Sequence, residues 1–116
     1  MGVVLFGIPN CDTVKKARTW LDARGLTYAF HDYKKLGVDA ATLNRWADVV
    51  GWEVLLNRAG TTFKKLPDAD KVDIDRAKAI ALMVANPSMI KRPVVEGAGP
   101  LLVGFKPDEW ATVFPA

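Results

Sequence analysis

Cys11 is the residue whose type and position point most directly to chemistry. It follows an apolar run at 3–6 and a turn, and it precedes a helical pattern. A cysteine at a helix start faces free backbone N–H groups and the positive end of the helix dipole, which favour the thiolate. Asn10 and the hydroxyl of Thr13 adjoin it, and Lys15 shares its helix face. Such a thiolate can attack a disulfide or an oxyanion.

A lone cysteine has a second interpretation, because free cysteines are among the most buried residues and often only fill space. The position of Cys11 at a strand–turn–helix junction favours the chemical interpretation, since open α/β sheets bind ligands at the carboxyl ends of their strands. Cys11 is also the only cysteine of the chain, which excludes an internal disulfide.

Two arginines could complete an anion site around the thiolate. Arg92 precedes Pro93, which opens an apolar strand pattern. This proline is a candidate for a cis peptide bond, and Arg92 could hold an oxyanion or carboxylate if the fold brings it beside Cys11. A solvated surface charge explains the spacing of Arg92 equally well. Arg58 lies in a polar loop with Gly60, where solvation is the more ordinary interpretation.

The composition narrows the class of protein. The chain has 116 residues, 50% of them hydrophobic and 25% charged, which predicts one domain. The charge of +3 comes from scattered basic residues, so direct nucleic-acid binding is not expected. Neither a membrane span nor a signal peptide is expected. One cysteine and one histidine disfavour a zinc site. The sequence therefore predicts a small soluble protein of the cytoplasm, with no bound metal or cofactor.

The positions of apolar residues predict the order of helices and strands. Strands are expected at 3–6 and 27–33, joined by a helix that ends near Gly25. Two or three helices should follow in the middle of the chain. Two apolar runs around the glycine-rich loop at 97–100 then predict an antiparallel hairpin, before a last helix that starts near Pro107.

This order, βαβ, a helical insert and ββα, is that of a thioredoxin-like α/β fold. The first βαβ unit should be parallel and right-handed. We expect one domain over 1–116, with a core of 1–35 and 87–116 and a helical insert of about 38–86.

Four motifs give the chain a resemblance to a known family over essentially its whole length. They are, in order, 6–17 (FGIPNCDTVKKA), 55–61 (LLNRAGT), 86–95 (NPSMIKRPVV) and 102–105 (LVGF). Together they resemble the arsenate reductase (ArsC)/Spx family, most closely its YffB-type subgroup. The resemblance implies a thioredoxin-like core with a helical insert and a catalytic cysteine at Cys11.

The resemblance also implies roles for basic residues. In arsenate reductases of this family the thiolate attacks arsenate, three arginines grip the oxyanion, and glutathione with glutaredoxin releases arsenite. By position, Arg92 matches one of these arginines, Arg58 lies one residue after another, and Lys106 stands near the third. Gly7 replaces a histidine of the arsenate reductases, and Lys15 replaces an arginine.

Two functions follow from the resemblance. The first is a glutathione-dependent thiol reductase, in which Cys11 attacks a small disulfide or oxyanion and glutathione or glutaredoxin supplies the electrons. The residues assigned to binding are Asn10, Thr13, Lys15, Arg58 and Arg92, with Pro93 as the cis-proline candidate. The alternative is a Spx-like regulator that binds RNA polymerase without catalysis. Spx proteins sense oxidation through Cys-x-x-Cys, and Val14 occupies the second position here, so a resolving thiol has to come from outside.

Overall fold

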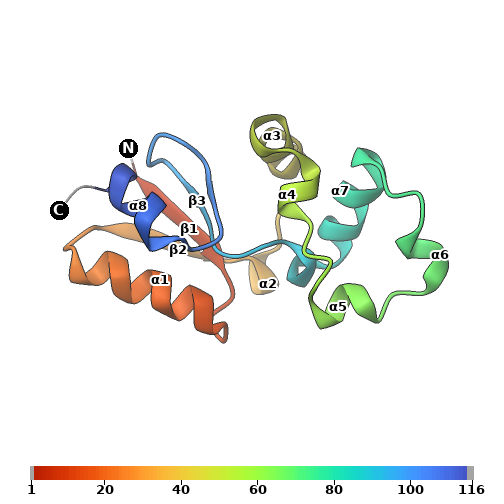
Figure 1. The fold of residues 1–116 in the computed structure, drawn as a ribbon, viewed down its shortest axis with the longest axis horizontal. Helices are drawn as coiled ribbons and strands as arrows, with labels where there is room; N and C mark the ends of the chain where they lie inside the picture. Colours follow the sequence, from red (N-terminus) through yellow and green to blue (C-terminus); the bar gives the residue numbers. More distant parts are fainter. Residues whose placement is uncertain (1, 115–116) are drawn as a thin grey trace. The chain divides into compact units, whose positions relative to one another are not determined.

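The computed structural model describes residues 2–114, which form two compact units (Figure 1). The first unit consists of residues 2–36 and 92–114, and the second is Gly37–Lys91. The expected domain over 1–116 includes residues 1, 115 and 116, which lie outside the described residues. Each unit is described by itself below.

A four-stranded mixed sheet forms the centre of the first unit. Its strands are β1 (Val3–Gly7), β2 (Tyr28–Asp32), β3 (Val94–Glu96) and β4 (Leu102–Val103), in the spatial order β2-β1-β3-β4. β1 pairs parallel with β2 and antiparallel with β3, and β4 pairs antiparallel with β3. This arrangement confirms the predicted α/β fold with its βαβ and ββ parts.

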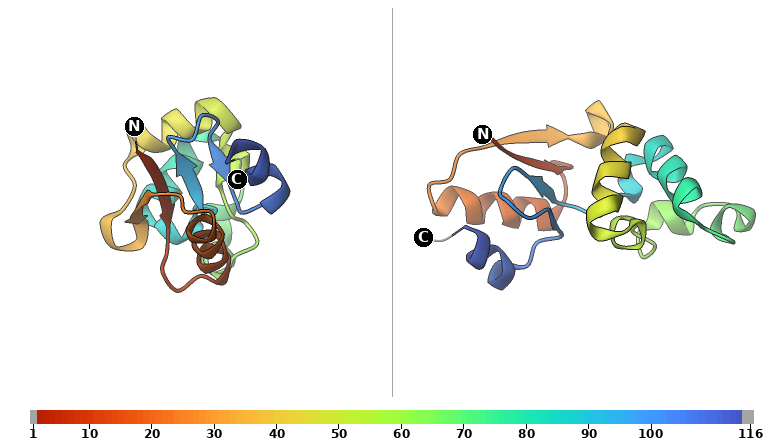
Figure 2. Two further views of the ribbon diagram at one scale, coloured as in Figure 1. Left: turned by 90° about the vertical axis from the view of Figure 1, so that its left-hand side faces the viewer. Right: turned by 90° about the horizontal axis from the view of Figure 1, so that it is seen from above.

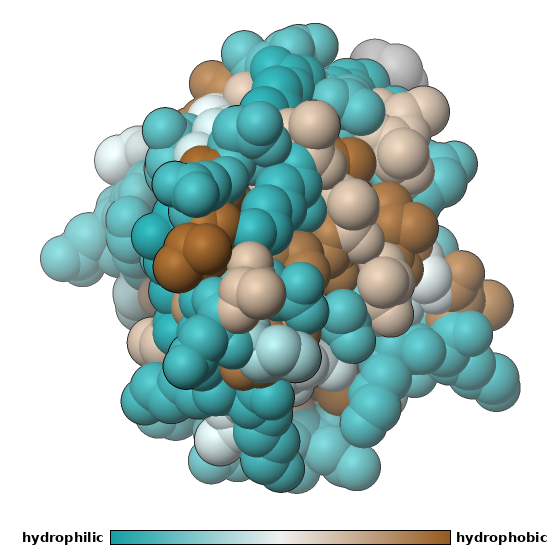
Figure 3. Space-filling view, turned by 90° about the vertical axis from the view of Figure 1, so that its right-hand side faces the viewer, coloured by the Kyte–Doolittle hydropathy of each residue, from teal (hydrophilic) through white to brown (hydrophobic). Residues whose placement is uncertain are grey.

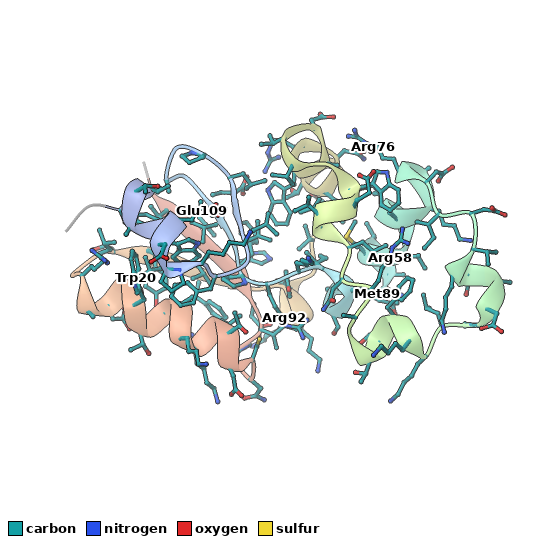
Figure 4. The ribbon with its side chains drawn as sticks, in the orientation of Figure 1. Trp20, Arg58, Arg76, Met89, Arg92 and Glu109 are labelled. Atoms are coloured by element: carbon teal, nitrogen blue, oxygen red, sulfur yellow. The ribbon has the colours of Figure 1, made fainter. Side chains whose placement is uncertain are left out.

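Three helices belong to this unit: α1 (Asp12–Ala23), α2 (Tyr33–Leu36) and α8 (Pro107–Val113). Figure 2 shows α1 and α8 on one face of the sheet, and Trp20, labelled in Figure 4, projects from α1 toward α8. Its ring lies 5.8 Å from that of Trp110, edge to face. The core beneath these helices is formed by Leu5, Val14, Ala17, Leu21, Val95, Leu102, Trp110 and Phe114.

Backbone hydrogen bonds fix both ends of α1. Cys11 is its N-cap residue, with an extended backbone (φ −113°, ψ 125°), and its carbonyl accepts from the N–H of Lys15 at 2.9 Å. The helix ends at Ala23, and Gly25 follows two residues later with a φ of +70°, which favours glycine. The Leu26 N–H then donates to the Leu21 carbonyl at 3.1 Å, which closes a Schellman motif. The predicted helix end near Gly25 is confirmed.

The expected strand at 27–33 is too long at its C-terminal end, because Tyr33 begins α2 instead. Oδ1 of Asp32 accepts hydrogen bonds from the backbone N–H groups of Lys34 at 3.1 Å and Lys35 at 3.3 Å. This cap stops the strand at Asp32 and starts a helical turn. Tyr33, at the first position of that turn, is fully buried.

The second unit is helical. Asp39 caps α3 by accepting from the Thr42 N–H at 2.8 Å, and Asp75 caps α7 by accepting from the Lys78 N–H at 2.9 Å. More helices form than expected, since the polar loop after Arg58 itself contains a helical turn. The elements are α3 (Ala40–Val50), α4 (Trp52–Leu55), α5 (Thr61–Lys64), α6 (Asp68–Lys71), α7 (Arg76–Ala85) and the 3₁₀ helix η1 (Pro87–Met89).

Residues 87–91 belong to the second unit, whereas the expected insert ended at about 86. Leu56 forms an antiparallel bridge with Ile90, and the Lys91 N–H donates to the Leu55 carbonyl at 2.8 Å. These non-local hydrogen bonds hold the segment against the chain that follows α4. The unit boundary therefore falls directly before Arg92.

Some apolar side chains remain at the surface of the second unit. Figure 3 faces the right-hand side of Figure 1 and shows brown apolar residues among hydrophilic ones. Val49 and Val72 are more than half exposed, at 65% and 54%. Within residues 2–114, no helix combines the length and apolar character needed to cross a bilayer.

Candidate thiol site

One edge of the sheet in the first unit brings together residues from three segments. β1 and β2 run parallel, so the segments that follow them leave the sheet at the same edge, and antiparallel β3 enters there. Cys11 follows β1, Tyr33 follows β2, and Arg92 lies just before β3. Figure 4 shows Arg92 beside the N-terminal end of α1. The Arg92–Pro93 peptide bond is cis.

The Cys11 thiol lies partly buried at the start of α1. This burial raises its pKa, but the Val14 N–H, the Arg92 guanidinium and the Thr13 N–H lower it. The lowering contributions outweigh the burial, so the pKa of Cys11 lies below its usual value. The site therefore favours the thiolate, which is the nucleophilic form of cysteine.

Arg92 contacts two side chains of the site. Its guanidinium is hydrogen-bonded to the Cys11 sulfur and to the Tyr33 hydroxyl. Burial lowers the pKa of Arg92, and the contacts with Cys11 and Tyr33 raise it by more, so the side chain stays charged. The next residue, Pro93, is held in place by a backbone hydrogen bond, in which its carbonyl accepts from the Gly104 N–H at 2.8 Å.

Tyr33 is the residue of this site that the sequence reasoning missed. The sequence placed it at the end of a strand and gave it no chemistry. The alternation of Tyr28 and Phe30 identified the strand, but it carries no information about a partner nearly sixty positions away in the sequence. An aspartate followed by tyrosine at the end of an expected strand could have signalled a helix cap.

The three residues predicted to stabilise the thiolate differ in what they contribute to the pKa of Cys11. Thr13 contributes its backbone N–H rather than the expected hydroxyl. Lys15 is exposed and is not among the groups that lower the pKa of Cys11. The Asn10 side chain is also exposed in the turn before Cys11. Backbone N–H groups and one guanidinium therefore carry the stabilisation of the thiolate.

Lys15 instead lines a groove that begins one helical turn after Cys11. The groove has a volume of about 440 Å³. Aromatic rings, a proline and the apolar stems of two lysines form much of its wall. Its lining residues are Lys15, Lys16, Thr19, Trp20, Phe105 and Pro107. Neither lysine has an ion pair with a carboxylate in the part of the chain that the structure describes.

Arg58 belongs to the second unit. Its guanidinium carbon lies 5.5 Å from the centre of the Trp52 ring, a cation–π contact. Asn57, which stands where the arsenate reductases have an arginine, has a local structural role. Its backbone N–H donates to the Met89 carbonyl at 2.7 Å, and its side chain accepts from the Ala59 N–H at 3.1 Å.

Gly7 leaves no room for a side chain. A Cβ atom there would lie 2.9 Å from Cγ2 and 3.2 Å from Cγ1 of Val14. Since Val14 is fully buried, a histidine at position 7 would require α1 to move. Among residues 2–114, no group of three or more histidine, cysteine or carboxylate side chains could hold a metal ion.

Comparisons with known proteins agree with this geometry. The structure superposes on the YffB protein with a TM-score of 0.93 and 60% identity, covering 97% of this chain and 98% of that one. An arsenate reductase (ArsC) related protein from Brucella melitensis gives a TM-score of 0.77 with 56% identity, covering 100% and 97%. The global transcriptional regulator Spx of Streptococcus mutans is 27% identical over 115 residues, covering 97% of this chain and 83% of Spx.

The family model described as "ArsC family" matches residues 6–113, which include the thiol, the cis-proline segment and the whole helical unit. The predicted resemblance is thereby confirmed, and the chain belongs to the ArsC family.

Proposed function

We propose that the protein is a glutathione-dependent thiol reductase in which the Cys11 thiolate attacks a disulfide. The observation that carries the proposal is the lowered pKa of Cys11, produced by the N–H groups of Thr13 and Val14 and by Arg92. The thiolate is the attacking species in thiol–disulfide exchange, so a lowered pKa increases the fraction of Cys11 that can react. The partly exposed sulfur leaves room for a second sulfur to approach.

The reaction balances with one cysteine and an external thiol. The Cys11 thiolate attacks the glutathione sulfur of a mixed disulfide, forms a Cys11–glutathione disulfide and releases the substrate thiolate, which takes up a proton. A glutathione thiolate then attacks the glutathione sulfur of that adduct, restores the Cys11 thiolate and leaves as oxidised glutathione. Two electrons pass from glutathione to the substrate, and a glutaredoxin could take the second step.

Positive charges support the binding of glutathione, which carries two carboxylates. Arg92 is charged beside Cys11, and Lys15 and Lys16 line the adjacent groove. Asn10, next to the thiol in the sequence, is assigned to the same substrate, and a role for Arg58 stays a prediction from the family correspondence. A small oxyanion such as arsenate would meet the same thiolate and guanidinium. The cytoplasm, where glutathione keeps thiols reduced, is the compartment that suits this reaction.

Incubation with oxidised glutathione, followed by intact mass measurement, tests the proposal. One glutathione should attach to Cys11, and reduced glutathione should remove it. Turnover is then measured with a glutathionylated peptide and with arsenate as separate substrates. The Cys11→Ser variant is the control and should show neither adduct nor turnover. A wild-type protein that forms no adduct, or whose thiol titrates at the usual pKa, would contradict the proposal.

A second candidate function is a Spx-like regulator that binds RNA polymerase. The similarity to Spx proteins over 97% of this chain favours it. Val14 removes the cysteine pair through which Spx senses oxidation, so such a regulator would act without that switch. Capture of polymerase subunits by both the wild type and Cys11→Ser, with no turnover by the wild type, would select this function.

A further inference from the structure

Tyr33 lies at the thiol edge of the sheet because of where β2 ends. Gly7, the last residue of β1, pairs with Asp32, the last residue of β2. Tyr33 is therefore the first residue beyond the sheet on the strand next to the one that leads to Cys11. Arg92 approaches the same edge from the other neighbour of β1, two residues before Val94, which pairs with Phe6. The three residues therefore flank three adjacent strands, β2, β1 and β3.

The Tyr33 hydroxyl is hydrogen-bonded to Arg92, and Tyr33 is fully buried. A guanidinium can only donate, so the phenol oxygen is the acceptor in this hydrogen bond. Burial raises the pKa of Tyr33 well above its usual range, and Arg92 opposes this only in part. The phenol is therefore neutral at any ordinary pH.

Because the Tyr33 phenol is a neutral acceptor, it affects Arg92 differently from a carboxylate. An aspartate at this position would neutralise Arg92 and weaken its attraction for the thiolate. The phenol fixes one side of the guanidinium and leaves its charge intact. An arginine side chain is also flexible, and each hydrogen bond that restrains it reduces the entropy lost when it binds the sulfur.

We propose that Tyr33 is a positioning residue that holds the Arg92 guanidinium against the Cys11 sulfur. This role deepens the thiol reductase function proposed above and rests on the same site. It can be tested without turnover, because Cys11 is the only cysteine and its alkylation rate reports directly on the thiolate.

The test measures the rate of Cys11 alkylation by iodoacetamide as a function of pH. Tyr33→Phe removes one oxygen atom and keeps the buried ring. We expect its pH profile to move to higher pH, with the rate below the midpoint falling about two- to tenfold, the effect of one lost hydrogen bond. In an Arg92→Met background, Tyr33→Phe should add nothing, because its effect passes through the guanidinium. An unchanged profile in Tyr33→Phe, or an equal shift without Arg92, would overturn the proposal.

The chain contains a matched control. Tyr28 accepts a hydrogen bond from Nε of Arg18 at 3.1 Å, a second tyrosine–arginine pair in the same unit. Neither residue is among the groups that shift the pKa of Cys11. Tyr28→Phe should leave the alkylation profile unchanged. If it shifts the profile as much as Tyr33→Phe does, the effect is general and the proposal fails.

A second measurement needs no substitution of Tyr33. The chain has two tyrosines, so labelling with 3-fluorotyrosine gives two ¹⁹F signals, which Tyr28→Phe assigns. The Tyr33 signal should shift with pH at the midpoint of the alkylation profile, and the Tyr28 signal should not. A Tyr33 signal that ignores the ionisation of Cys11 would refute the contact. Failure of the reductase assay alone would leave both readouts intact, so the two proposals can be told apart.

Discussion

Replacement of Gly7 by alanine tests how the packing beneath α1 supports the thiolate. The new Cβ would lie 2.9 Å from Cγ2 and 3.2 Å from Cγ1 of Val14, closer than such atoms normally approach. Val14 has one strongly preferred rotamer in a helix, so its side chain cannot turn away. The start of α1 must shift instead, and with it the Val14 N–H that faces the Cys11 sulfur.

Two opposing effects set the size of the change. Overpacking of a core costs about 1–3 kcal/mol. Alanine in place of glycine gains about 0.4–1 kcal/mol by restricting the unfolded chain. We therefore expect Gly7→Ala to lower the free energy of unfolding by about 1–2 kcal/mol. Urea unfolding measures this loss, and the alkylation profile should move to higher pH because the N–H of Val14 is displaced.

A double-mutant cycle identifies the clash. Val14→Ala removes both methyl groups that the new Cβ would meet, so the two substitutions together should cost less than their sum by about 0.5–3 kcal/mol. Gly2→Ala is the control, because no atom lies within 4 Å of a Cβ built there. Strict additivity in the cycle, or wild-type stability of Gly7→Ala, would refute the packing argument.

Three further predictions concern the site itself. Cys11→Ser should abolish turnover and match the wild-type stability at acidic pH. Since the folded-state pKa of Cys11 is lowered, the wild type should gain stability over this variant as pH rises through that pKa, reaching the full gain above the usual thiol pKa; parallel stability–pH curves would contradict the lowered pKa. Arg92→Met should slow alkylation at neutral pH by about tenfold, because contact between opposite charges is worth about 1–4 kcal/mol; an unchanged rate would remove Arg92 from thiolate stabilisation. Lys15→Glu should raise KM for glutathione without moving the alkylation profile, and an unchanged KM would exclude the groove from glutathione binding.

Local sequence signals were sufficient to predict the order of the four strands and of the helices α1 and α8 in the first unit. The apolar run before Cys11, the stripe along the following helix and the stop at Gly25 all act within a few residues. The caps of α3 and α7 act over the same short range, since the carboxylates of Asp39 and Asp75 accept from backbone N–H groups three residues later. Patterns of this kind determine where a helix or strand forms because the forces involved are short in range.

The end of the helical unit was not predictable in the same way. Residues 87–91 join this unit through the pairing of Ile90 with Leu56 and of Lys91 with Leu55. These partners are more than thirty positions apart in the sequence. No feature of the segment at 87–91 by itself indicates that its backbone will find them.

The same division between near and distant partners applies to the site. The position of Cys11 at a helix start follows from adjacent residues, and so do the N–H groups that face it. The approach of Arg92 to Cys11 depends on the pairing of distant strands, and Tyr33 was missed because its partner Arg92 is equally distant in the sequence. The prediction that Lys15 stabilises the thiolate differs from the structure for another reason. Helical spacing assigns a side chain to a face, but an exposed lysine extends into water, where its charge is screened.

Val14 explains why this site should need a thiol from outside. It stands three residues after Cys11, one helical turn away, where a second cysteine could close a disulfide. Its side chain is fully buried in the core and contacts the Gly7 position, while its N–H faces the sulfur. The position therefore supports the thiolate through packing and a backbone donor instead of supplying a second sulfur. Any mixed disulfide on Cys11 can then be resolved only by a separate molecule, and the lysines along the adjacent groove favour one that carries carboxylates.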